Sequence, residues 1–158
     1  APRRSAARRR ATRRFATLRN DFTSKGNPLM TLILRESDLI DLNIVTDGDE
    51  YWYLASPYSS LDKAEAFVSA AFAAAWLIGN GVRVYSPITH SHPIAHYGGL
   101  DPLDLDLWLR VDKPFMANAC GLIILQLPGW RESKGILFEQ HEFTAAKKPI
   151  HCMAWPIA

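Results

Sequence analysis

The sequence contains few cysteines and no long hydrophobic run. Its two cysteines, Cys120 and Cys152, are too few for the disulfide framework of a small secreted protein. No apolar stretch approaches the roughly 18 residues that a membrane-spanning helix requires. We therefore expect no membrane partner and a reducing, cytoplasmic location, with both thiols buried as core residues.

Several motifs of nucleotide-binding and nucleophilic proteins are also missing. The chain has no G-x-x-x-x-G-K-S/T loop and no G-x-G-x-x-G turn after a strand, which argues against a P-loop NTPase and a classical dinucleotide enzyme. Neither cysteine belongs to a C-x-x-C pair, and no G-x-S-x-G elbow is present. We predict that the protein uses no cofactor.

Positive charge is concentrated at the start of the chain. Residues 1–29 carry eight arginines and one lysine against one aspartate, a net charge of +8, so the remainder carries −6 of the overall +2. An acidic domain attracts polyanions poorly. We therefore expect a small-molecule ligand, with nucleic acid as a partner only through the basic tail.

The basic tail, residues 1–29, is rich in Arg, Ala, Ser and Thr and is expected to be disordered. Three interpretations are open: an organelle presequence, a nucleic-acid-binding arm, or sequence upstream of the true start. We favour the third, because Met30 opens a stretch that is typical of a protein beginning.

Hydrophobic spacing after the tail predicts one α/β domain over residues 30–158. With 48% hydrophobic and 22% charged residues, the chain has the composition of a single domain with a substantial core. The segment before residue 51 is expected to be an irregular or short-strand lead-in. The pattern then predicts strands over 51–55, 82–85, 121–125 and 149–153, and helices over 64–78, from Asp101 or Asp104 to 116, and over 134–147.

Two local signals refine the expected helix boundaries. Ser59 or Ser60 is expected to cap the first helix, because serine side chains accept hydrogen bonds from the free N–H groups of a first turn. Pro114 is expected to divide or kink the second helix, because proline removes one of the hydrogen bonds of the helix interior.

Strands that alternate with helices imply right-handed crossovers and a parallel sheet with helices on both faces. We predict a three-layer, doubly wound fold with a mainly parallel sheet, similar to the flavodoxin and Rossmann folds. Ligands bind such sheets beyond the carboxyl ends of the strands. The segments that matter are therefore the loops Ser56–Ser60, Ser86–Leu100 and Gln126–Gly135.

Three side chains near this edge are candidates for catalysis. Glu139 lies about one turn into the helix over 134–147, where the helix dipole is expected to keep it ionised, as a nucleophile must be. Asp112 supplies a second carboxyl group that can donate a proton to a leaving group. Tyr53, near the end of the first strand, can orient a carboxylate. The alternatives are a carboxylate that only complements the dipole, a solvated helix acid and a core aromatic residue.

Three histidines lie between residues 86 and 100. His90, His92 and His96 raise the hypothesis of a zinc site, because imidazoles are common zinc ligands. Their spacing matches no known ligand pattern, and no convincing fourth ligand lies near them in the sequence. We therefore predict contact with a substrate and no bound metal.

Taken in order, several motifs resemble the nucleoside 2-deoxyribosyltransferase superfamily. They are Tyr53-Leu54-Ala55-Ser56-Pro57, Asp112, Gly129-Trp130-x-x-Ser133-x-Gly135-x-x-x-Glu139 and Ala145-Ala146-Lys147-Lys148-Pro149-Ile150. The similarity covers roughly residues 50–154 and is greatest to a small branch with a Tyr-Leu-Ala-Ser-Pro-Tyr opening and a Gly-Trp-x-x-Ser-x-Gly loop. The chain departs from many members at Cys120, where they carry an aspartate that is structural.

The resemblance implies cleavage or transfer at the N-glycosidic bond of a nucleoside or nucleoside 5′-monophosphate. Glu139 would attack the anomeric carbon and form a glycosyl ester, Asp112 would handle the proton of the departing base, and Tyr53 would position Glu139. Ser133 would touch the sugar or the nucleophile. Members often complete a neighbour's site, so a homo-oligomer, dimer or higher, is expected.

The candidate substrate-binding residues are Ser56, Pro57, Ser59, Ser86, His90, Trp130, Ser133 and Gly135. Few lysines or arginines accompany them, so a free nucleoside is slightly preferred over a phosphorylated one. Two other functions stay open. One is a non-catalytic nucleotide-binding sensor, and the other is a metal-dependent hydrolase that uses the three histidines.

Overall fold

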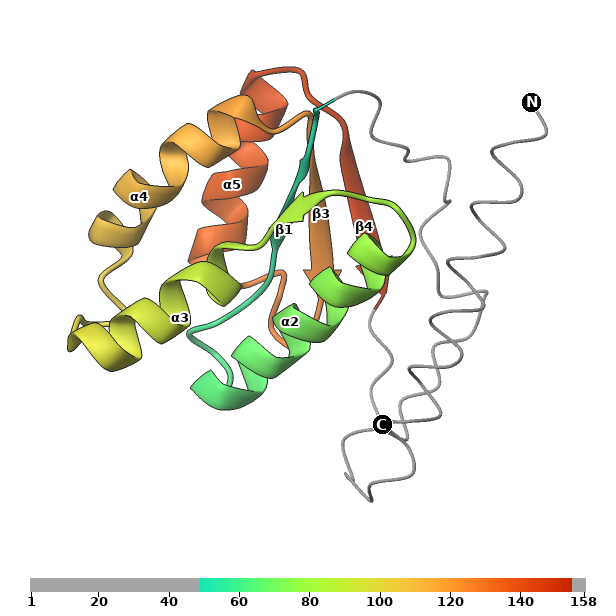
Figure 1. Cartoon of the computed structure of the whole chain (residues 1–158). Coiled ribbons are helices and arrows are strands. Elements are labelled where there is room, and N and C mark those ends of the chain that lie inside the picture. Colours follow the sequence, from blue (N-terminus) through green and yellow to red (C-terminus); the bar gives the residue numbers. More distant parts are fainter. Residues whose placement is uncertain (1–48, 155–158) are drawn as a thin grey trace, which may run out of the picture.

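The computed structural model describes residues 49–154, which form a parallel sheet with helices on both faces (Figure 1). The elements in chain order are β1 (Trp52–Ala55), α2 (Lys63–Gly79), β2 (Val84–Tyr85), α3 (Pro87–Gly98), α4 (Leu105–Asn118), β3 (Gly121–Gln126), α5 (Lys134–Ala145) and β4 (Ile150–Ala154). The strand order is β2-β1-β3-β4, and every neighbouring pair is parallel. The prediction of a doubly wound α/β fold is confirmed.

Residues of β1 alternate between the two faces of the sheet, as successive strand residues must. Trp52 and Leu54 belong to the hydrophobic cluster beneath α2, whereas Tyr53 and Ala55 belong to the cluster beneath α4 and α5. Both faces are therefore buried. This explains why the strand has a run of apolar and aromatic residues without polar interruption.

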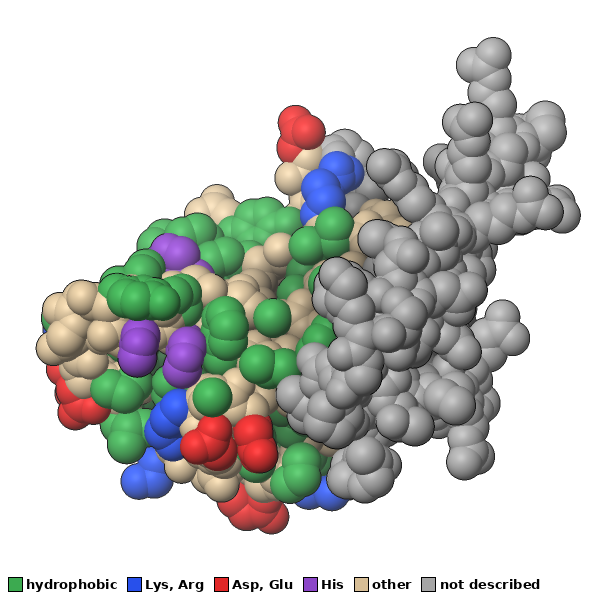
Figure 2. Space-filling model, turned by 60° about the horizontal axis from the view of Figure 1, so that its bottom comes forward, with side chains coloured by type: hydrophobic (Ala, Val, Ile, Leu, Met, Phe, Trp, Pro, Cys, Tyr) green, Lys and Arg blue, Asp and Glu red, His purple; other side chains and the backbone are tan. Residues whose placement is uncertain are grey.

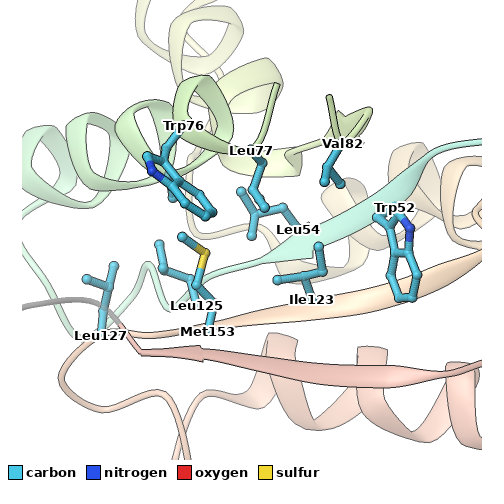
Figure 3. Packing of buried hydrophobic residues seen from close by; sticks show 10 residues of the cluster. Trp52, Leu54, Trp76, Leu77, Val82, Ile123, Leu125, Leu127 and Met153 are labelled. Carbon is cyan, nitrogen blue, oxygen red and sulfur yellow. The ribbon is translucent and has the colours of Figure 1, made fainter. Parts of the chain in front are cut away.

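The cluster on the α2 face packs Trp76 and Leu77 of the helix against Leu54 and Ile123 of the sheet (Figure 3). At the amino end of β3, Gly121 lies directly against the ring of Trp52, and a Cβ atom added there would overlap that ring. Glycine is required at this position by the close approach of the neighbouring indole. The result is a dense layer that fixes β1 and β3 in register.

Side chains cap the amino ends of the helices. For α2 the cap is Asp62, which accepts hydrogen bonds from the backbone N–H groups of Ala64 and Glu65 at 3.0 and 3.1 Å. The expectation that Ser59 or Ser60 caps this helix was wrong, because an aspartate closer to the first turn occupies the position. For α4 the cap is Asp104, one of the two residues expected.

Most of the segment 86–100 forms helix α3, Pro87–Gly98, so the prediction of a long loop was wrong. Ser86 caps this helix, Pro87 lies in its first turn, and Gly99 ends it in the left-handed conformation with φ 67°. The sequence did not predict this helix because Pro93, a residue that usually ends helices, lies inside it. Similarly, Pro114 does not divide α4, which is one helix from Leu105 to Asn118.

The two cysteines do not both lie in the core. Cys152 is exposed, which contradicts the expectation for that thiol. Cys120 is partly buried just before β3, and its thiol donates to the carbonyl oxygen of Tyr51 at 3.1 Å. Within residues 49–154, no helix has both the length and the hydropathy that a membrane span needs.

The predictions for the basic tail, for a start at Met30 and for most of the lead-in concern residues 1–48, which lie outside the described residues. Residues 155–158 lie outside them as well.

Candidate active site

Tyr53 and Glu139 form a buried pair on the face of the sheet that α4 and α5 cover. The phenol of Tyr53 donates a hydrogen bond of 2.9 Å to Oε1 of Glu139, although the two residues are 86 positions apart in the sequence. Glu139 lies in the second turn of α5 and is 7% exposed, and Tyr53 is fully buried. The geometry brings together the two residues that sequence analysis paired.

Burial raises the pKa of Glu139 from its ordinary 4.5 to about 8, although the hydrogen bond from Tyr53 acts in the opposite direction. The negative charge of Asp112 raises it further. The raised pKa differs from the expectation that the helix dipole keeps this side chain ionised. Loss of hydration outweighs the dipole, because Glu139 faces the interior instead of the end of α5.

Asp112 is held in the same way by a second tyrosine. The phenol of Tyr85 donates a hydrogen bond of 2.9 Å to Oδ1 of Asp112, which is 5% exposed. Burial raises the pKa of Asp112, while the Tyr85 hydrogen bond and the charge of His90 lower it. Asp112 is thus a buried acid of the interior and not a solvated acid of a helix surface.

Tyr85 is a site residue that sequence analysis missed. It is the register partner of Tyr53 on the neighbouring strand, and the two ring centroids are 5.8 Å apart. Its ring stacks on Phe115 of α4 with centroids 4.0 Å apart, which fixes the phenol beside Asp112. A signal was present in the sequence, because Tyr53 and Tyr85 both lie close to the carboxyl end of a predicted strand.

The three histidines do not converge on one point. Nδ1 of His90 lies 3.3 Å from the phenol of Tyr85, whereas Nδ1 of His92 lies 2.8 Å from the phenol of Tyr58. His96 stacks on His92 with centroids 6.4 Å apart. Among residues 49–154, no three His, Cys, Asp or Glu side chains are arranged to hold a metal ion.

The loop between β1 and α2 is tied to its surroundings by two side chains. Lys63 donates from Nζ to the carbonyl oxygens of Tyr58, Ser59 and Leu61 at 3.1 to 3.2 Å. Tyr58 is joined in turn to His92 of α3. These contacts hold Ser59 on the surface, so it is the least enclosed of the predicted binding residues in this loop.

Ser56 and Pro57 lie at the carboxyl end of β1, and both are buried. The hydroxyl of Ser56 has no hydrogen-bond partner among the described residues. A buried hydroxyl without a partner costs free energy, on the order of 1–3 kcal/mol, which a ligand or a water molecule can recover. Of the predicted binding residues, Ser56 therefore has the strongest independent signal of ligand contact.

Two other predicted binding residues serve as helix caps. Ser86 caps α3 by accepting from the N–H of Thr89, and Ser133 caps α5 by accepting from the N–H of Ile136. The acceptor distances, 3.5 and 3.4 Å, are long, so both hydroxyl groups keep the capacity to bind a ligand as well.

The loop between β3 and α5 places the remaining candidates. Trp130 packs against the α4 and α5 face, with the guanidinium of Arg131 over its ring at 4.5 Å. Gly135 lies in the first turn of α5, where an added Cβ would meet only the Ser133 hydroxyl, at 3.9 Å. Gly129 has φ 79°, and an added Cβ would approach Ser60 Oγ to 2.8 Å. The loops after β1 and β3 therefore lie against each other at this point.

Figure 2 brings forward the side of the molecule at which the strands of Figure 1 end. On this side the histidine side chains lie among hydrophobic side chains, next to a small group of charged residues. The surface near the predicted ligand loops is therefore mixed in character. It has none of the continuous basic colouring that a polyanion site would show.

Comparison with known families supports one assignment. The family model described as "Domain of unknown function (DUF1937)" matches residues 50–155, which is most of the chain. A comparison with curated proteins gives no match. The family description names no activity, so a function has to be argued from the site.

Proposed function

This chain belongs to the DUF1937 family, and from its site we propose that the protein cleaves or transfers at the N-glycosidic bond of a nucleoside or nucleoside 5′-monophosphate. The observation that carries the proposal is the pair of buried carboxyl groups, Glu139 and Asp112, each held by a tyrosine of adjacent strands. The resemblance of the motifs to nucleoside 2-deoxyribosyltransferases supports the same chemistry. The proposed enzyme needs no cofactor.

In the first step, ionised Glu139 attacks the anomeric carbon of the sugar. An oxygen–carbon bond forms as the carbon–nitrogen bond breaks, and the electron pair of the broken bond stays on the base nitrogen. Protonated Asp112 gives its proton to the departing base, so the base leaves neutral. Tyr53 donates to Glu139 and keeps one carboxylate oxygen free for attack.

This step needs one proton on the carboxyl pair, and that proton has to be on Asp112. Burial raises the pKa of both groups, and their mutual repulsion favours a state in which only one is ionised. The tyrosine hydrogen bonds stabilise the ionised form of either group. Because the pKa of Glu139 is about 8, the proton lies on Glu139 at neutral pH before the substrate binds. The positive charge that develops on the sugar during bond breaking favours ionised Glu139 and leaves the proton on Asp112.

In the second step, the glycosyl ester of Glu139 is attacked by water or by a second base. The attacking group gives its proton to Asp112 and Glu139 leaves as a carboxylate, which restores the starting state. Attack by water gives hydrolysis, and attack by a base gives transfer. Ser56, with its unpartnered hydroxyl, is the first candidate to bind the sugar.

The proposal is tested by measuring base release from a panel of ribo- and deoxynucleosides and their monophosphates, with and without a second free base. The wild-type protein should release or exchange a base, and Glu139→Ala should reduce the rate by at least about a thousandfold, as loss of a nucleophile does. Glu142→Gln is the matched control. Glu142 lies almost one turn further along α5, and within residues 49–154 its side chain has one ion-pair contact, with His141 at 3.5 Å, so its loss should leave the rate unchanged.

If a nucleoside binds tightly but no base is released under any condition, the protein is a nucleotide-binding sensor that uses the same site and not an enzyme. The metal-dependent alternative has little support, because the three histidines face different partners. Chelation by EDTA should therefore leave base release unchanged.

We also propose that the protein is a homo-oligomer. Several large apolar side chains are exposed around the turn from α3 to α4: Ile94, Tyr97, Leu100, Leu103 and Leu105. Tyr97 is 86% exposed and Leu103 is 53% exposed, and exposed apolar side chains that gather into one patch are typical of interfaces. Light scattering on the purified protein should give a mass of at least two chains. A monomeric mass would contradict the proposal.

A further inference from the structure

Tyr85 bridges a buried acid and an exposed imidazole. Its phenol oxygen lies 2.9 Å from Oδ1 of Asp112 and 3.3 Å from Nδ1 of His90. Asp112 is 5% exposed, whereas the side chain of His90 is on the surface. The three groups form a continuous chain of hydrogen bonds from the site to solvent.

This chain of hydrogen bonds has two arrangements, which differ by the transfer of one proton between His90 and Asp112. When Asp112 is ionised, the single hydroxyl hydrogen of Tyr85 points to the carboxylate, so Nδ1 of His90 has to carry the hydrogen of the second bond. When Asp112 is protonated, its own O–H donates to the Tyr85 oxygen, and Tyr85 donates to an unprotonated Nδ1. The phenol can serve in both, because it is donor and acceptor at once.

We infer that Tyr85 and His90 are positioning residues that load Asp112 with the proton it delivers to the leaving base. The inference rests on the proposed function and extends it. In the transfer, the N–H bond of the His90 imidazolium breaks as a new O–H bond forms at Tyr85. The original Tyr85 O–H bond breaks as an O–H bond forms at Asp112, and His90 is left neutral. Solvent then reprotonates His90. The proton that Asp112 takes from the attacking group in the second step returns to solvent by the reverse transfers, through Tyr85 to His90.

Tyr53 of β1 and Glu139 of α5 are the titratable groups on the inner side of Asp112. Burial raises the pKa of both, and the negative charge of Asp112 raises it further. Burial raises the pKa of Tyr85 most, Asp112 raises it further, and Tyr51 adds a smaller increase. With Tyr85 kept neutral, it can relay a proton but cannot hold a charge of its own.

The rigid setting of Tyr85 makes the inference testable by removing the hydroxyl alone. Tyr85→Phe keeps the ring that stacks on Phe115 and so keeps the packing. Tyr51→Phe is the matched control, because Tyr51 lies nearby and its phenol donates only to the carbonyl oxygen of Phe115, at 2.8 Å. His141→Ala, an exposed histidine of α5, is the control for His90→Ala.

The measurement is base release from two kinds of substrate. On an ordinary purine nucleoside, Tyr85→Phe and His90→Ala should lower kcat by roughly 10–100-fold with KM nearly unchanged, which is part of the roughly 10²–10⁴-fold that general acid catalysis contributes. On an N7-methylated purine nucleoside the base leaves neutral without a proton, so both losses should shrink to a few-fold. Added imidazole should restore part of the rate of His90→Ala, and the two control variants should match wild type.

Equal losses on both substrates, or no response to imidazole, would overturn the inference while leaving base release by the wild type intact. Failure of the proposed function would appear differently, as no release by the wild type itself. A measurement without substrate separates the two cases. In nitrogen NMR, Asp112→Asn should shift the His90 resonances in the wild-type background and not in the Tyr85→Phe background. Equal shifts in both backgrounds would contradict the proposed chain of hydrogen bonds from Asp112 through Tyr85 to His90.

Discussion

At the scale of single residues, the site uses one side chain type for two different tasks. Tyr53 is fully buried and can donate only to Glu139, so it acts as a fixed support. Tyr85 reaches both Asp112 and the surface residue His90, so it can also pass a proton. The difference comes from position in the sheet, because β1 is an inner strand and β2 is an edge strand.

Tyr53→Phe should move the pH dependence of base release to higher pH. After burial, which raises the pKa of Glu139 to about 8, the Tyr53 hydrogen bond is the main influence that lowers it. A hydrogen bond to a charged group contributes about 1.5–3 kcal/mol, so its loss should raise this pKa by about one unit or more. At pH 7 the rate should fall about tenfold, and the gap to wild type should narrow as the pH rises. A pH–rate profile of both proteins measures this, and a loss independent of pH would contradict it.

At the scale of elements, α3 shows where pattern analysis fails. The helix begins with Pro87 and contains Pro93 and three histidines, so the sequence has no amphipathic period to detect. The signals that define it are local, namely the Ser86 cap and the left-handed Gly99. Its position against α2 then depends on contacts such as the stacking of Phe67 on His92, which no local pattern encodes.

The turn after β3 offers a prediction at the same scale. Gly129→Ala should destabilise the fold by about 1–3 kcal/mol, because φ 79° is unfavourable for alanine and its Cβ would press on Ser60. Gly81→Ala isolates the first effect: φ is 85° there, and no atom lies within 4 Å of the added carbon. It should cost only about 1–2 kcal/mol. Urea unfolding measures both, with Gly98→Ala as a control without positive φ. A cost for Gly81→Ala that equals or exceeds that of Gly129→Ala would contradict the contact with Ser60.

At the scale of the whole molecule, the sequence predicted one parallel sheet with helices on both faces, but no order of the strands within it. The apolar strand segments and the alternation with helices are sufficient for this, because few topologies satisfy both. It also selected Tyr53, Asp112 and Glu139 as candidate site residues, and the structure buries all three. It could not predict that Tyr85 lies beside Asp112 or that Glu139 is buried, because both follow from the register of β1 with β2 and from the rotation of α5.

Stability should fall as the pH rises from about 5 to 8. The folded-state pKa of Glu139 is raised from 4.5 to about 8, so the stabilisation is complete below pH 4.5 and is lost as the pH passes through 8. The expected change is on the order of a few kcal/mol, and burial of Asp112 acts in the same direction. Thermal melting over this pH range measures it.

Glu139→Gln should remove most of this pH dependence, because a neutral amide of the same shape can still accept from Tyr53. At pH 8 its Tm should exceed that of wild type by roughly 5–10 °C, while base release is lost. Glu142→Gln should follow the wild-type curve. If Glu139→Gln has a lower Tm than wild type at pH 8, the ionised carboxylate of Glu139 does not destabilise the folded state and the prediction is wrong.

The long sequence separation between paired residues has a consequence for the newly made chain. Tyr53 and Glu139 are 86 positions apart, and at the usual ~5–20 residues per second a ribosome needs roughly 4–17 s to add the second after the first. Strand β1 also waits for β3, its inner neighbour in the sheet, until α4 has been made. The buried Tyr53–Glu139 pair therefore forms late in synthesis, and a nascent chain that stalls before α5 contains both tyrosines, Tyr53 and Tyr85, without the carboxylate of Glu139.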